Sequence, residues 1–176
     1  MIAPEQVRIS LMTDKRSVAL HSIVMLLLLA LASAQEFHGQ LSTAEKQHIL
    51  DGPFTVRSKT EDMPASVRQA FAKITSESSF SLANPGQKFQ LTDVNPDRKL
   101  PLRRLVLAAS QGGEWVIHYE RGGLAHSYCV LIFSVDSRNS LKFIWGGAGF
   151  HPAESLEELR KMIASGQLAD DIKPYW

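Results

Sequence analysis

Cysteine is nearly absent from this chain, since Cys129 is the single one among 176 residues. One thiol cannot form a disulfide within the chain, which excludes a small fold held together by disulfides. The domain must therefore be held by the packing of an apolar core. The sequence also contains no Asn-x-Ser/Thr glycosylation site, which fits a bacterial source.

An excess of charge of either sign is also absent, because 19 Lys and Arg residues stand against 18 Asp and Glu residues. The charged residues of the first 34 positions are Glu5, Arg8, Asp14, Lys15 and Arg16, and without them the counts become 16 and 16. A net charge near zero gives no electrostatic basis for binding nucleic acid or an anionic membrane surface. We expect no nucleic-acid partner.

The one long apolar run lies near the N-terminus, at residues 23–32, after the basic pair Lys15 and Arg16. Ala32 and Ala34 then place small residues where a signal peptidase reads them. The run is short for a membrane span, which needs about 20 residues. Residues 1–34 are predicted to be a signal peptide cleaved after Ala34, with an uncleaved N-terminal anchor as the alternative.

The predicted mature protein, residues 35–176, is one domain in the periplasm or outside the cell, with no stable membrane insertion. No cysteine stands at the cleavage point, so a lipoprotein anchor is not expected. Either Met1 or Met12 is the true start of the chain. The length that remains suits a single hydrophobic core.

Hydrophobic periodicity and turn residues predict an α+β domain. Helices are expected after Ser42, after Pro64 and after Ser155, the first and last with capping-box spacing to Glu45 and Glu158. Strands are expected at residues 89–93, 103–110, 114–120, 125–135 and 141–145, and residues 54–59 are read as an extended segment. Short connections predict an antiparallel meander of four to five strands, packed with N-terminal and C-terminal helices. A cystatin-like roll is the nearest architecture, and the tail from Asp170 to Trp176 is expected to dock.

The paired glycines predict which side chains share a sheet face. If Gly122-Gly123 is a two-residue turn, His118 faces Ser127, and His118 and Cys129 are diagonal neighbours on one face. Trp115, Tyr119, His126 and Tyr128 then lie on the other face, at a hairpin whose tip bears Arg121. The same rule at Gly112-Gly113 places Leu107 beside His118 and Ala109 beside Val116, and the strand from Tyr128 to Val135 is expected to be central.

These faces suggest two functions. Aromatic residues beside an arginine are typical of binding hot spots, so the predicted binding residues are Trp115, Tyr119, Arg121, His126 and Tyr128. The favoured function is an exported binding or inhibitory module for a protein, peptide or glycan ligand. The alternative is a small thiol-dependent enzyme that uses Cys129 with His118. No orienting third residue is evident for such a pair, and a buried structural cysteine is the commoner case.

Metal and cofactor sites are not expected. His126 is predicted to point away from His118 and Cys129, and no histidine stands at HxxH or HExxH spacing. The glycine-rich residues 145–150 lack the lysine and the spacing of a phosphate-binding loop. Neither the histidine spacing nor the glycine-rich segment indicates a particular reaction.

Overall fold

The computed structural model describes residues 40–93 and 99–170, all of which belong to the compact unit Phe37–Trp176. The predicted signal peptide and the predicted docking of the tail from residue 171 onward lie outside the described residues. The elements in chain order are α2 (Thr43–Asp51), β1 (Thr55–Arg57), the short 3-10 helix η1 (Thr60–Asp62), α3 (Ala65–Ile74), β2 (Arg103–Gln111), β3 (Glu114–Arg121), β4 (Ser127–Val135), β5 (Leu141–Gly149) and α4 (Leu156–Ser165). The predicted α+β class is confirmed, while the cystatin-like roll stays an architectural likeness only.

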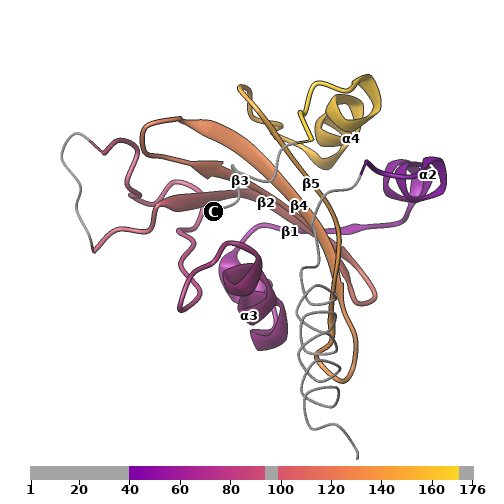
Figure 1. The fold of residues 1–176 in the computed structure, drawn as a ribbon, viewed down its shortest axis with the longest axis horizontal. Coiled ribbons are helices and arrows are strands. Elements are labelled where there is room, and N and C mark those ends of the chain that lie inside the picture. Colours follow the sequence, from indigo (N-terminus) through magenta and orange to yellow (C-terminus); the bar gives the residue numbers. More distant parts are fainter. Residues whose placement is uncertain (1–39, 94–98, 171–176) are drawn as a thin grey trace, which may run out of the picture. The chain divides into compact units, whose positions relative to one another are not determined.

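The five strands form one antiparallel meander in the order β1-β2-β3-β4-β5 (Figure 1). The strand predicted at residues 89–93 is wrong, because those residues form no strand. They are held instead by isolated backbone hydrogen bonds. The N–H of Gln90 donates to the carbonyl of Pro101, and the carbonyl of Leu91 accepts from the N–H of Gly123. The first strand is β1, within the segment predicted as extended.

Helices cover both faces of the sheet. Helix α3 packs on one face, and α2 and α4 lie on the other (Figure 1). Strand β4 is buried on both sides, with Leu131 and Phe133 toward α3 and Val130 and Ile132 toward α4. This arrangement confirms the predicted coverage of both faces of β4, which is an interior strand next to the edge strand β5, while β3 is the middle strand. Each large apolar side chain buried there contributes about 1.5–3 kcal/mol relative to exposure.

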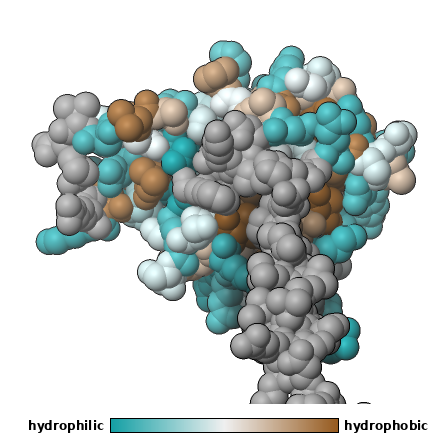
Figure 2. All heavy atoms as spheres, viewed as in Figure 1, coloured by the Kyte–Doolittle hydropathy of each residue, from teal (hydrophilic) through white to brown (hydrophobic). Residues whose placement is uncertain are grey.

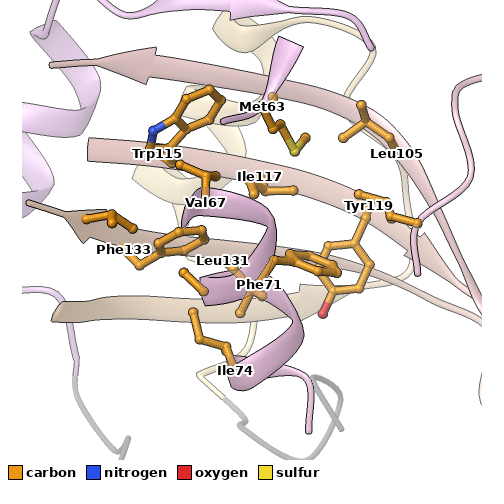
Figure 3. Packing of buried hydrophobic residues seen from close by; sticks show 14 of the residues in the cluster. Met63, Val67, Phe71, Ile74, Leu105, Trp115, Ile117, Tyr119, Leu131 and Phe133 are labelled. Carbon is orange, nitrogen blue, oxygen red and sulfur yellow. The ribbon is translucent and has the colours of Figure 1, made fainter. Parts of the chain in front are cut away.

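The apolar stripe predicted for α3 forms the centre of one core. Val67, Ala70, Phe71 and Ile74 are all buried, and Phe71 lies edge-on to Tyr119 with ring centroids 5.4 Å apart (Figure 3). The spacing i, i+3, i+4, i+7 places these side chains on one side of the helix. Helix α3 therefore covers one face of strands β3 and β4 and buries the side chains that project from it.

The helix starts agree with the sequence, with one difference. Ser42 and Glu45 form the predicted reciprocal capping box. At α4 only half of the box forms: Ser155 accepts from the N–H of Glu158, while the Glu158 carboxylate accepts from Glu154 rather than from Ser155. Gly166 ends α4 in the left-handed conformation, as predicted.

The two glycine pairs behave differently. Gly112-Gly113 closes a two-residue turn in which Gln111 pairs with Glu114, so Leu107 lies opposite His118 as predicted. The second prediction is wrong, because Arg121 pairs with Ser127 and the connection is residues 122–126. His118 consequently lies opposite Val130 rather than Ser127. A displacement by an odd number of residues moves every side chain of β4 to the opposite face relative to β3.

The second glycine pair has a different structural task. Gly122 and Gly123 donate their N–H groups to Leu102 and Leu91, which brings the connection against the segment before β2. A Cβ atom at Gly122 would lie 1.9 Å from the carbonyl oxygen of Gln90. Glycine is needed here for close backbone approach, not for a tight hairpin.

Candidate functional site

His118 is a fully buried histidine that links three segments of backbone. Its Nδ1 lies 2.9 Å from the carbonyl oxygen of Cys129, and its Nε2 accepts from the N–H of Ala153 at 3.0 Å. Because Nε2 accepts, Nδ1 carries the proton and donates, which is the neutral imidazole. Burial lowers the pKa of His118 from 6.5 to about 4. The ring therefore has a structural role at neutral pH.

Cys129 lies on the other face of the sheet, toward α3. Its side chain is fully buried, and its Sγ lies 3.7 Å from the Oγ of Ser127. Burial raises the pKa of the Cys129 thiol, and this outweighs the hydrogen bonds from Ser127 and Tyr119. The predicted thiol–imidazole contact is wrong because the register places the two side chains on opposite faces. His118 contacts the carbonyl of Cys129 instead.

The predicted aromatic face is also divided by the true register. Trp115 and Tyr119 are buried beneath α3 (Figure 3), and half-buried Arg121 alternates onto the same side. Tyr128 pairs with Glu120 and projects from the α4 side, while His126 lies exposed in the connection before β4. Of the predicted binding residues, only His126 and Tyr128 are brought together near solvent.

Those two residues belong to a cluster centred on a buried carboxylate. The Glu120 side chain is only 6% exposed, and its Oε2 accepts from the Nε and Nη2 of Arg104 at 3.0 and 2.5 Å. Its Oε1 lies 2.7 Å from the Nε2 of His126. One carboxylate thus holds an arginine from β2 and a histidine from the β3–β4 connection. We call Arg104, Glu120, His126 and Tyr128 the Glu120 cluster.

Aromatic rings contact both partners of the Glu120 carboxylate. The Arg104 guanidinium lies 4.5 Å from the centroid of the Phe89 ring, within cation–π range. Tyr128 lies edge-on to His126 with ring centroids 5.2 Å apart. Partial burial, and then the charge of Glu120, raise the pKa of Tyr128, so its hydroxyl remains a hydrogen-bond donor at neutral pH.

A hollow of about 340 Å³ opens beside the Glu120 cluster. It is lined by Pro85, Gly86, Arg104, Leu105, Val106, Glu120, Tyr128, Pro152 and Glu154, which come from the loop after α3, from three strands and from the loop before α4. This volume is at the lower end of the range for ligand pockets, about 300–1,000 Å³. The hollow has room for one side chain or a small molecule.

Exposed apolar side chains gather at the same end of the sheet. Among the described residues four large apolar side chains are exposed: Val56, Leu91, Leu124 and Phe150. Leu124 follows Gly123, which bonds to the backbone of Leu91, and Phe150 follows Gly149, which pairs with Tyr128. We call the connection 122–126, together with Leu91 and Phe150, the β3–β4 end. Figure 2 shows hydrophobic residues (brown) among hydrophilic ones at the left of the molecule, where Figure 1 draws this connection.

Metal ligands do not gather in the described ranges, where no three His, Cys, Asp or Glu residues are arranged to hold an ion. Likewise, no helix within residues 40–93 and 99–170 is long and apolar enough to cross a membrane. Of the histidines considered in the sequence, His38 lies outside the described residues. The Glu120 cluster is therefore interpreted through its hydrogen bonds and charges.

Comparison with protein-family models, with curated proteins and with solved structures found no match for this chain. The functional interpretation consequently rests on the geometry of the β3–β4 end and the Glu120 cluster.

Sequence reasoning missed Arg104 and Glu120, although a signal for them exists. The turn at Gly112-Gly113 alone would place Arg104 opposite Arg121. A register shift between Leu105 and Leu107 moves Arg104 to Glu120 instead. A β-bulge of this kind has no clear sequence pattern, so only the presence of opposite charges on adjacent strands could have indicated the pair.

Proposed function

We propose that this protein is an exported binding or inhibitory module that docks a partner protein through its β3–β4 end. The observation that carries the proposal is the placement, at that end and beside the Glu120 cluster, of three of the four large apolar side chains that are exposed in residues 40–93 and 99–170. Single exposed apolar residues are normal on a protein surface. Their gathering at one end of the sheet is what favours an interface.

The degree of exposure supports this interpretation. Leu124 is 94% exposed and Phe150 is 85% exposed, so neither side chain contributes appreciably to the core. Covering such side chains with a partner would yield roughly 25 cal/mol for each Å² of apolar surface removed from water. Both residues stand on connections, where binding residues commonly occur on rigid scaffolds.

The Glu120 cluster supplies the polar part of the same surface. A buried carboxylate costs several kcal/mol in lost hydration unless its partners compensate, and Arg104 and His126 supply that compensation. An arginine held on both sides, by Glu120 and by the Phe89 ring, has lost its rotamer freedom before binding. Aromatic, arginine and apolar side chains in one rigid patch are the composition of binding hot spots.

The location of the protein outside the cytoplasm is part of the proposal. It is supported by the basic pair, the short apolar run and the small residues at 32–34. An oxidising compartment also suits a chain whose single thiol is buried. A partner from the cell envelope or the medium is therefore expected.

A capture experiment tests the docking surface. The full-length protein, tagged at its C-terminus and produced in its source cell, is used to retain proteins from an envelope extract. A double variant, Leu124→Asp with Phe150→Asp, is compared with Val56→Asp, an equally polar change on β1. We expect a protein that wild type and Val56→Asp both retain and that the double variant loses, with all melting temperatures similar. Equal retention by the three forms would refute the proposed surface.

A further inference from the structure

The hollow beside the Glu120 cluster has walls of two kinds. Pro85, Val106, Pro152 and the Tyr128 ring present carbon surface. Glu120, Arg104 and Glu154 bring charge to the same space. An occupant that matches both kinds of wall needs an apolar stem and a charged end.

The charged residues of the lining decide whether the charged end of the occupant is positive or negative. The Arg104 guanidinium already donates two N–H groups to Glu120, so its positive charge is compensated. Glu154 is exposed, and within the part of the chain that the structure describes its carboxylate forms no ion pair. Because Arg104 and Glu120 compensate each other, the carboxylate of Glu154 is the charge of the lining that stays without an ion pair among the described residues.

The N-terminus of α4, next to Glu154, does not reverse this balance. Just before this helix the N–H of Glu154 donates to the Glu158 carboxylate, and in its first turn the N–H of Glu158 donates to the Ser155 hydroxyl. Glu157 and Glu158 also place negative charge in the first turn, where the helix dipole favours it. An incoming anion would find these donors occupied and two carboxylates in the lining.

We infer that the hollow binds a basic side chain, lysine or arginine, of the partner polypeptide. The aliphatic stem packs on Pro85, Val106 and Pro152, and the cationic head lies at Glu154 near the face of Tyr128, where cation–π attraction adds to the ion pair. Charge complementarity of this kind fixes the register of an interface. The inference deepens the proposed function, because it names the partner group that the Glu120 cluster receives.

Two short peptides test the inference directly. Acetyl-Gly-Arg-Gly-amide and acetyl-Gly-Glu-Gly-amide are titrated separately into the isotopically labelled full-length protein, and backbone amide shifts are followed by NMR. The arginine peptide should move the amides of Gly86 and Tyr128 saturably, and less so as salt is raised. The glutamate peptide should not move them. Equal binding of both peptides, or no shift at the hollow, would overturn the inference.

A matched pair of variants tests whether the Glu154 carboxylate is the group that attracts the arginine peptide. Glu154→Gln removes the carboxylate at the rim, and we expect the arginine peptide to bind about threefold more weakly, as for a partly exposed ion pair. Glu157→Gln is the control, because Glu157 lies three residues further on, in the first turn of α4, pairs with Lys161 and does not line the hollow. It should leave the peptide affinity unchanged. Unchanged affinity in Glu154→Gln would contradict the assignment.

The outcomes separate this inference from the proposed function. If the arginine peptide fails to bind while the variant at Leu124 and Phe150 still loses its captured protein, the basic-side-chain inference is wrong and the docking surface stands. If the peptide binds but capture is unaffected by that variant, the hollow is a basic-group site and the apolar docking surface is wrong.

Discussion

His118 donates its Nδ1–H to the carbonyl of Cys129 over 2.9 Å, while the Cys129 thiol points to the opposite face of the sheet. Two residues that sequence reasoning pairs as a nucleophile and a base are thus joined through the backbone. The imidazole also accepts from Ala153, so it ties β3, β4 and the loop before α4 together. Protonation of this ring is consequently coupled to the stability of the fold.

Acid should destabilise the protein through His118. Burial lowers the pKa of His118 in the folded protein to about 4 from 6.5, so the unfolded chain binds more protons in that interval. The free energy of unfolding should therefore fall as pH is lowered from about 6.5 to about 4, by roughly 3 kcal/mol from this residue. Denaturant unfolding at a series of pH values measures the slope.

The variant His118→Asn isolates this contribution, because asparagine hydrogen-bonds without titrating. The variant is expected to be less stable at pH 7 and to show a shallower dependence of stability on pH below 6.5. A slope identical to that of the wild type would mean that His118 is not the titrating group.

The Cys129 thiol should be inert in the native protein. Its side chain is fully buried and burial raises its pKa, so little thiolate is present and reagents have no access. We expect a thiol reagent to react with the native protein far more slowly than with the denatured protein, at every pH from about 5 to 9, a range around the ordinary cysteine pKa. Fast native labelling at low pH would show an activated thiol and would restore the enzyme hypothesis.

Gly122 should be more sensitive to a methyl group than a glycine with positive φ in open space. At Gly86, where φ is 78°, a Cβ atom would have no neighbour within 4 Å, so Gly86→Ala should cost about 1 kcal/mol for its left-handed backbone alone. In Gly122→Ala the new Cβ meets the Gln90 carbonyl, and the backbone must move. A larger loss of stability is expected for Gly122→Ala. Equal losses, measured by thermal unfolding, would contradict the close approach.

Glu120 should be important for stability as well as for the binding surface. Glu120→Ala leaves Arg104 and His126 without their shared acceptor, and we expect a loss of about 2 kcal/mol, less than for a fully buried pair because Arg104 is one-third exposed. Arg138→Ala, which removes the exposed pair with Asp136, should leave stability nearly unchanged. Similar losses in both variants, measured by denaturant unfolding, would show that the Glu120 ion pairs contribute no more than a surface pair.

Local sequence signals predict the elements better than their pairing. The stripe of α3, the capping box at Ser42 and the turn at Gly112-Gly113 each depend on residues close together in the chain, and all three are confirmed. Strand β1 is predicted only as an extended segment, because its pairing with β2 joins residues more than 50 positions apart. No local pattern specifies such a contact.

The site could not be predicted for a related reason. A glycine pair has the same sequence whether it closes a tight turn or allows close packing, and at Gly122 the contact with Gln90 decides between them. The resulting register places Tyr128 on the face opposite Trp115 and Tyr119, which are buried beneath α3, so that only His126 and Tyr128 of the predicted set lie together near solvent. Because the side-chain period of a strand is two, one error in the turn changes the whole predicted face.

Cross-linking in the living cell tests the central claim that the β3–β4 end is the docking surface. A photoreactive amino acid replaces Leu124 in one strain and Val56 in another, both being exposed apolar positions. Irradiation should give a discrete cross-linked species from position 124 and none from position 56. Equal cross-linking at both positions, or adducts from position 56 alone, would contradict the account.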